Sequence, residues 1–259
     1  MQITTTQSSQ KMGMIQAVLL GIGIIGNITC MALYLSPIPT FKRIIKEKDT
    51  GQFSAFTYVC SLFKCLLWTL YGLPIITDNN ITIATMNGIG IAFEMVYVLI
   101  YLVYAPQAEK IRVGAMEAAS LTSFFVLAAC VVTVVPKSRR SLILGVFCVA
   151  LNILMYAAPL SVLKQVKQNK SASSMPFLVS LFTLVNSAVW LAYGILKIDV
   201  FVIIPNGLGV LLGTIQIIVF YIYTKDPKIS TKVEQNGNNK IVGSHQNGIC
   251  KLTEIPDMV

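Results

Sequence analysis

Residues 65–74 read Cys-Leu-Leu-Trp-Thr-Leu-Tyr-Gly-Leu-Pro, and residues 187–196 read Ser-Ala-Val-Trp-Leu-Ala-Tyr-Gly-Ile-Leu. The pattern Trp-x-x-Tyr-Gly therefore occurs twice, with an offset of 122 residues. A tyrosine, a proline and a lysine recur with the same offset, as Tyr34 and Tyr156, Pro37 and Pro159, and Lys48 and Lys170. Asn87-Gly88 recurs at an offset of 119 as Asn206-Gly207, so the second copy is shorter after its middle segment. The sequence predicts an internal repeat.

The repeat lies in an unusually apolar chain. Of its 259 residues 12% are charged and 55% are hydrophobic, and the mean hydropathy is +0.71. A soluble domain has about a quarter of its residues charged, so most of this surface cannot face water. A helix needs about 20 apolar residues to cross a hydrocarbon core of about 30 Å. Seven such spans are predicted, at residues 14–35, 53–73, 83–104, 113–135, 141–163, 175–196 and 200–223.

Three spans per copy is an odd number, so one further helix is needed for both copies to cross in the same direction. The fourth span lacks the Pro, Trp and Asn landmarks and is predicted to be this linker. We therefore predict an all-α membrane protein of two parallel three-helix bundles joined by a linker helix. The predicted units are an external N-terminus at 1–13, a first repeat at 14–104, a linker helix with its loops at 105–140, a second repeat at 141–223, and a disordered tail at 224–259. Such repeats place a substrate site at the middle of the membrane, so transport is favoured.

The formal net charge of +9 is distributed as a topology signal. One side of the predicted membrane carries 5 Lys and Arg residues, the other side carries 14, and Lys64 lies inside a span. The positive-inside rule then predicts an external or lumenal N-terminus and a cytosolic tail. No basic stripe is interleaved with exposed aromatic residues, so nucleic acid is not expected as a partner.

No residue pattern points to enzyme chemistry. The six cysteines have no metal-ligand spacing, and the single histidine, His245, has no predicted catalytic partner. Nucleotide loops, zinc motifs and nucleophile elbows do not occur in the sequence. We expect no enzyme activity, no cofactor and no metal.

Four polar or aromatic residues pair across the repeat inside apolar spans. An unpaired amide in hydrocarbon costs on the order of several kcal/mol, so Asn87 and Asn206 must face protein or water. An amide is both donor and acceptor, which suits a hydroxyl-rich ligand, although hydrogen bonding between helices is the alternative. Trp68 and Trp190 can stack on the face of a sugar ring, and the alternative is an aromatic belt at the membrane interface.

Two charged residues lie inside predicted spans. A lysine at the middle of a span, as Lys64 is, costs about 3 kcal/mol or more and marks a polar cavity. Lys64 precedes Trp68 by four residues, so both lie on one helix face, and snorkelling is the alternative. Glu94 lies in the third span, where it can pair with a cation or carry a proton, and the sequence leaves this open.

Residues near the span ends suggest gates. Pro37, Pro159 and Pro176 lie near the predicted cytosolic ends, where proline removes a backbone donor and weakens the helix. Because Pro37 recurs as Pro159, hinges are favoured over simple tolerance of proline at a helix end. Tyr71 and Asp199 lie near the opposite ends, where a hydroxyl-to-carboxylate contact would close an outer gate.

Longer stretches carry a more specific signal. Residues 36–50 read Ser-Pro-Ile-Pro-Thr-Phe-Lys-Arg-Ile-Ile-Lys-Glu-Lys-Asp-Thr, residues 156–161 read Tyr-Ala-Ala-Pro-Leu-Ser, and residues 204–207 read Ile-Pro-Asn-Gly. Together with residues 65–74, they closely resemble the eukaryotic SWEET sugar facilitators of the MtN3/saliva family, especially those of plants, over residues 14–224. The resemblance implies energy-independent, bidirectional uniport of hexoses or sucrose, through a fold of parallel repeats and with oligomers.

The resemblance also assigns roles to single residues. It implies a sugar pocket at Asn87, Asn206, Trp190 and Trp68, a cytosolic gate at Pro37, Thr57, Pro159 and Pro176, and an external gate at Tyr71 and Asp199. Two departures from the family pattern stand out. Thr57 replaces the fourth proline, and Lys64 replaces a pocket Asn or Ser, which would change the solute, couple transport to a proton, or impair transport. Met155 and Asn186 are bulkier than the Val and Ser of sucrose carriers, so a monosaccharide such as glucose is the expected substrate.

Two further readings stay open. One is a transport-impaired or differently selective relative that acts in hetero-oligomers, which the Thr57 and Lys64 departures favour. The other is a seven-helix receptor, which the repeat disfavours and for which neither an Asp-Arg-Tyr nor an Asn-Pro-x-x-Tyr motif is present. The expected partners are a sugar, membrane lipid, and further copies of this chain or of a relative. The plasma membrane is the first expectation for its location and the vacuolar membrane the second.

Overall fold

The computed structural model describes residues 2–51, 53–78, 80–172, 175 and 177–225, and within these residues it is all-helical. Pro176, one of the predicted hinge residues, lies outside the described residues, as does the predicted tail from residue 226 onward. Nine helices are described: α1 (Gln2–Leu35), α2 (Ile38–Glu47), α3 (Phe56–Gly72), α4 (Ile81–Tyr104), α5 (Gln107–Thr133), α6 (Lys137–Met155), α7 (Ala157–Asn169), α8 (Phe177–Lys197) and α9 (Val200–Lys225).

The nine helices correspond to seven crossings. Six helical stretches of the described chain are long and apolar enough to span a membrane, at 13–47, 81–104, 107–133, 137–169, 177–197 and 200–224. The remaining crossing is α3, whose 17 residues measure about 25 Å and so lie at the lower limit for a span. The prediction of a seven-helix membrane fold is confirmed.

There are two more helices than crossings because the first and fifth crossings each consist of two helices separated by a break. Pro37 follows the end of α1 and is the N-cap of α2, and Pro159 lies in the first turn of α7, directly after α6. Proline is tolerated in the first turn of a helix because the amide it lacks would have no partner there. Both short helices end at a lysine in the left-handed conformation, Lys48 with φ 53° and Lys170 with φ 49°.

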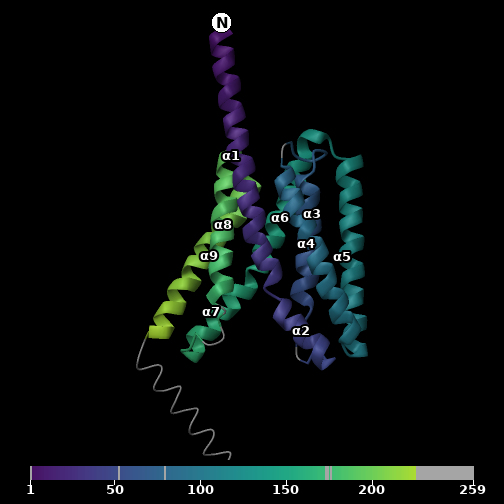
Figure 1. Ribbon diagram of the computed structural model, residues 1–259. Helices are drawn as coiled ribbons and strands as arrows, with labels where there is room; N and C mark the ends of the chain where they lie inside the picture. Colours follow the sequence, from purple (N-terminus) through teal and green to yellow (C-terminus); the bar gives the residue numbers. More distant parts are fainter. Residues whose placement is uncertain (1, 52, 79, 173–174, 176, 226–259) are drawn as a thin grey trace, which may run out of the picture.

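The backbone of α1 extends further than the sequence predicts. It is helical from Gln2, whereas the apolar pattern places the start of the span at Met14. Adding a residue to an existing helix gains a hydrogen bond without a new nucleation cost, so a helix can continue past the apolar segment. Figure 1 shows this N-terminal part of α1 projecting beyond the other helices.

The helices form two parallel bundles that share one packing pattern. In the first bundle α4 packs against α1 and α3, and in the second α9 packs against α6 and α8. The bundles meet twice, with α1 against α8 and α3 against α6. Because α1 corresponds to α6 and α3 to α8, these two contacts are equivalent. The linker α5 packs on α3 and α6, and Figure 1 shows it at the edge of the molecule.

The two ends of the molecule differ. Near the start of α4, the largest buried cluster joins the bundles through Trp68 and Tyr71 on one side and Trp190 and Tyr193 on the other. At the opposite end α2 packs on α4 and α7 on α9, so each short helix belongs to its own bundle. Figure 1 shows α2 and α7 apart from each other at this end.

Candidate functional site

A cavity of about 230 Å³ lies between the two bundles. Its walls come from α1, α3 and α4 of the first bundle and α6, α8 and α9 of the second. The polar residues that line it are Ser61, Lys64, Asn87, Glu94, Asn152, Asn186 and Asn206, and the aromatic residues are Tyr34, Trp68, Tyr156 and Trp190. The volume is below the range of about 300–1,000 Å³ typical of drug-sized ligand sites, so the cavity suits a small solute.

Helical spacing explains why these side chains meet. Residues three, four or seven positions apart lie on one helix face, and Ser61, Lys64 and Trp68 of α3 have this spacing. Asn186 and Trp190 of α8 are four residues apart, as Lys64 and Trp68 are, and also share one helix face. Six of the seven predicted substrate-binding residues therefore line a single cavity.

Asn87 and Asn206 adopt the same geometry in the two bundles. The Nδ2 of Asn87 donates to the carbonyl of Ile83 at 2.9 Å, and the Nδ2 of Asn206 donates to the carbonyl of Val202 at 2.8 Å. In each case the partner is four residues earlier in the same helix, and the amide oxygen makes no hydrogen bond within the described chain. Two acceptors thus face the cavity, which matches the donor needs of hydroxyl groups.

Asn152 and Asn186 complete the amide lining from the second bundle. The Nδ2 of Asn152 donates to the carbonyl of Cys148 at 3.0 Å. The Oδ1 of Asn186 accepts a hydrogen bond of 2.9 Å from the hydroxyl of Thr29 in α1, across the interface between the bundles. Asn186 is therefore positioned by a contact that depends on how α1 and α8 pack.

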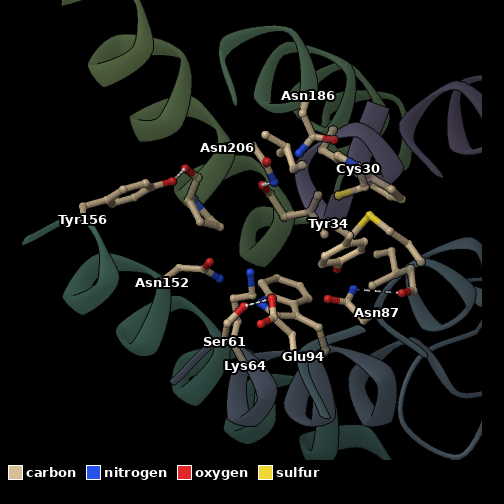
Figure 2. A pocket seen from close by; sticks show the side chains of 17 residues that line it. Cys30, Tyr34, Ser61, Lys64, Asn87, Glu94, Asn152, Tyr156, Asn186 and Asn206 are labelled. Atoms are coloured by element: carbon tan, nitrogen blue, oxygen red, sulfur yellow. Dashed lines mark hydrogen bonds between the residues drawn. The ribbon is translucent and has the colours of Figure 1, made fainter. Parts of the chain in front are cut away.

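Lys64 and Glu94 form the charged part of the wall. Ser61 Oγ donates to Glu94 Oε1 at 2.6 Å, whereas Glu94 Oε2 is buried and has no hydrogen-bond partner in the described chain. Lys64 lies at the middle of α3 and makes no hydrogen bond and no ion pair within 4.0 Å to any described residue. Figure 2 shows Ser61, Lys64 and Glu94 together on one side of the cavity, opposite Asn186 and Asn206.

Trp190 supplies a further group without a partner. Its side chain is 4% exposed, and its indole Nε1 is buried without a hydrogen bond in the described chain. A buried donor without a partner costs about 1–3 kcal/mol. Neighbouring protein atoms cover both Glu94 Oε2 and Trp190 Nε1, although the two residues belong to the cavity wall.

The two predicted external gate residues are in direct contact. The Tyr71 hydroxyl donates to the Asp199 carboxylate, at 2.8 Å from Oδ1 and 2.9 Å from Oδ2. Asn80 Nδ2 also donates to Asp199 Oδ2, at 3.2 Å, and the Tyr193 hydroxyl donates to Asn80 Oδ1 at 3.2 Å. Thr82 Oγ1 lies 3.1 Å from the Tyr193 hydroxyl. This network joins the two bundles near the start of α4.

The described hinge candidates lie at the other end. Pro37 and Pro159 are half-buried at the breaks after α1 and α6, and Thr57 is exposed in the first turn of α3. The hydroxyl of Tyr97 in α4 donates to the carbonyl of Tyr34, at 2.5 Å, close to the first break. The corresponding residue of α9 is Gln216, so the second bundle has no tyrosine hydroxyl at this position.

Met155 is placed differently from the other predicted pocket residues. It is the last residue of α6 and is not among the residues that line the cavity, whereas Leu33, its counterpart in the first repeat, is. The sequence reasoning also did not identify Ser61 or Asn152 as lining residues. The counterpart of Asn152 in the first repeat is Cys30, so the pairing that selected Asn87 and Asn206 does not select Asn152, although it is an amide inside an apolar span. Among the described residues no group of three potential metal ligands occurs.

Comparison with known proteins gives consistent results. The model of a family described as sugar efflux transporter for intercellular exchange, MtN3_slv, matches residues 21–109 and again residues 142–228. The chain is 42% identical over 206 residues to bidirectional sugar transporter SWEET7b of Oryza sativa subsp. japonica, covering 78% of this chain and 77% of that protein. It is 43% identical over 201 residues to bidirectional sugar transporter SWEET1 of Arabidopsis thaliana, covering 78% of this chain and 81% of that protein.

A solved structure agrees with these matches. A eukaryotic SWEET transporter superimposes with a TM-score of 0.80 at 34% sequence identity, covering 82% of this chain and all of that chain. The agreement includes the seven-helix arrangement of two parallel bundles and a linker.

Proposed function

The chain belongs to the MtN3/saliva (SWEET) family of sugar transporters, and from this premise we propose that it carries monosaccharides, glucose among them, by facilitated diffusion in both directions. It is an integral membrane protein that crosses the membrane several times and transports sugar, and it is not an enzyme. The choice of sugar and the mechanism are the parts that we propose.

The cavity supports a monosaccharide as the substrate. Its volume of about 230 Å³ is the single observation that carries this choice, since it favours one sugar ring over two. The free oxygens of Asn87 and Asn206 would accept hydrogen bonds from sugar hydroxyls, and the indoles of Trp68 and Trp190 would pack on the ring. We propose that Asn186 and Lys64 add donors, and that Met155 acts on solute size from the end of α6.

We propose alternating access as the mechanism. The Tyr71–Asp199 contact would be the external gate, closed in the conformation described above. The breaks at Pro37 and Pro159, together with Thr57 and Pro176, would let the α2 and α7 ends separate and rejoin. Rocking of the two bundles about their equivalent interfaces would then expose the cavity to one side at a time.

We propose the following boundaries and location. The repeats occupy 14–104 and 141–223, with 105–140 as the linker segment, an N-terminus at 1–13 outside and a tail at 224–259 in the cytosol. The plasma membrane is the first candidate location and the vacuolar membrane the second. Homo- or hetero-oligomers within the lipid bilayer are proposed as the assembled form.

Uptake of radiolabelled glucose and sucrose into cells that lack endogenous carriers tests the function. We expect glucose uptake that is stronger than sucrose uptake and indifferent to external pH, because no ion gradient drives it. Asn206→Ala should abolish most of the uptake, because it removes an acceptor from the cavity wall. The matched control is Asn169→Ala, which changes an exposed asparagine at the end of α7.

Surface expression of the variants must be equal for the comparison to hold. Sucrose uptake that exceeds glucose uptake would overturn the monosaccharide proposal. Uptake that depends steeply on external pH would overturn facilitated diffusion.

A further inference from the structure

The cavity wall carries two charges of opposite sign. Among its lining residues, Lys64 and Glu94 are the ones with charged side chains, and both belong to the first bundle. Glu94 is 7% exposed. The second bundle lines the cavity with neutral amides instead. The site as a whole is therefore neutral, but the charge is concentrated on one side, as Figure 2 shows.

These two charges are not joined in an ion pair. The Lys64 ammonium lies more than 4.0 Å from the carboxylate oxygens of Glu94, since no ion pair connects them. Each still lies in the electrostatic field of the other. The polar contact that Glu94 makes is with Ser61, and its second oxygen is buried and unpaired in the described chain. Both residues line the cavity, so its wall holds two opposite charges that do not neutralise each other by direct contact.

In the internal repeat, the two charges are present together in one copy and absent together in the other. The counterpart of Lys64 is Asn186, and the counterpart of Glu94 is Gly213. A Cβ at Gly213 would lie 3.0 Å from Leu184 Cβ, so α8 and α9 pack closely where the first bundle holds its carboxylate. The second bundle thus has neither charge at these two positions, and the first bundle has both. A lone buried charge is strongly unfavourable, whereas two opposite charges compensate each other.

We propose that Lys64 and Glu94 form a charge-compensating pair that makes the cavity select neutral sugars over sugars with a net charge, an inference that rests on the proposed sugar transport. With both charges present, a neutral polyol meets a cavity wall without net charge, and its hydroxyls accept hydrogen bonds from Lys64. A sugar acid would add a second negative charge, and a protonated amino sugar a second positive charge. Either would be rejected because it leaves the cavity with a net charge.

Removal of one charge should then invert the selectivity. Glu94→Gln leaves Lys64 alone and should favour an anionic sugar such as glucuronate. Lys64→Asn leaves Glu94 alone and should favour protonated glucosamine. The double variant restores neutrality, with an amide at position 64 as at Asn186 in the second bundle. It should therefore resemble the unchanged protein more than either single variant does.

The experiment uses the full-length chain in lipid vesicles, with uptake of glucose, glucuronate and protonated glucosamine measured for all four proteins. We expect the glucuronate-to-glucose ratio to rise about tenfold or more in Glu94→Gln, and the glucosamine-to-glucose ratio to rise similarly in Lys64→Asn. Lys46→Asn, an exposed lysine of α2, serves as the control and should change neither ratio. Unchanged ratios in both single variants would overturn the proposal.

Thermal unfolding in detergent provides a second readout that does not require transport. Each single variant should unfold at a lower temperature than the double variant, because each buries a charge without its compensating partner. Additive effects of the two substitutions would contradict the pair. If the unchanged protein takes up none of the three sugars, the proposed function fails. The unfolding temperatures still decide whether Lys64 and Glu94 form a pair.

Discussion

At the residue scale, one carboxylate, that of Asp199, connects the two bundles. Asp199 lies between α8 and α9 and accepts hydrogen bonds from Tyr71 and Asn80, which precede and follow the turn between α3 and α4. It also accepts from the backbone amides of Phe201 and Val202. Asp199 thus fixes the start of its own helix and the end of a helix in the other bundle with one side chain.

The Tyr71 hydroxyl has one proton for both Asp199 oxygens, so Tyr71→Phe removes one hydrogen bond to a charged acceptor. Such a bond contributes about 1.5–3 kcal/mol, and its loss should shift the equilibrium towards the outward-open form by roughly tenfold or more. Cys30, which lines the cavity, is a natural reporter. In intact cells, a membrane-impermeant thiol reagent should label Tyr71→Phe faster than the unchanged protein.

The control for this measurement is the same variant with Cys30→Ser, in which the additional labelling should disappear. If labelling of Cys30 is equally fast with and without the Tyr71 hydroxyl, the Tyr71–Asp199 contact does not control access to the cavity.

At the element scale, close packing of the third helix in each bundle depends on glycine. A Cβ at Gly90 in α4 would collide with the hydroxyl of Tyr34 in α1 and lie 2.8 Å from Cys65 Sγ in α3. In α9, a Cβ at Gly209 would collide with Ser187 Oγ and lie 3.1 Å from the hydroxyl of Tyr156. The same close contact, of a glycine in the third helix with a tyrosine and a small residue of the same bundle, therefore occurs in both bundles.

Gly90→Ala should lower the thermal unfolding midpoint in detergent, because overpacking costs about 1–3 kcal/mol. Gly88→Ala, two residues earlier in α4, is the matched control because a Cβ at Gly88 would have no atom within 4 Å. Its midpoint should stay unchanged or rise slightly, since alanine is the better helix former. Equal effects of the two substitutions would show that helix propensity, rather than the contact with Tyr34, decides stability.

Helices that end inside a span were harder to predict than the spans themselves. Hydropathy predicts seven crossings because lipid imposes one length on all of them. The predicted first span ends at residue 35, as α1 does, but the predicted fifth span at 141–163 runs through the break between α6 and α7, because apolar residues continue past Tyr156. The location of a break depends on local backbone geometry and on packing against α4 and α9, which a hydropathy window does not contain.

At the scale of the whole molecule, the orientation predicted from the basic residues can be tested directly. An epitope placed before Met1 should bind antibody on intact cells, and an epitope after Val259 should bind after permeabilisation alone. The reason is that the side carrying 14 basic residues is retained in the cytosol. The opposite pattern of binding would reverse the assignment of Tyr71 and Asp199 to the external side.

The candidate site was predictable to the extent that the repeat marked it. Asn87, Asn206, Trp68 and Trp190 could be selected because each has a counterpart, and Lys64 because a charge in a span is rare. The contact of Ser61 with Glu94 could not be predicted, since it depends on how α3 and α4 are rotated relative to each other. Sequence periodicity gives the face of each helix, but not the partner that the face meets.

The charges on one wall of the cavity break the approximate twofold symmetry of the molecule. The two ends of a hexose ring then meet different chemical surroundings, with an ammonium and a carboxylate on one side and amides on the other. A sugar would consequently bind in one preferred pose rather than in two related by the repeat. Because the axis that relates parallel repeats runs along the membrane normal, the sugar would turn the same side of its ring towards the charged wall whichever way it passes.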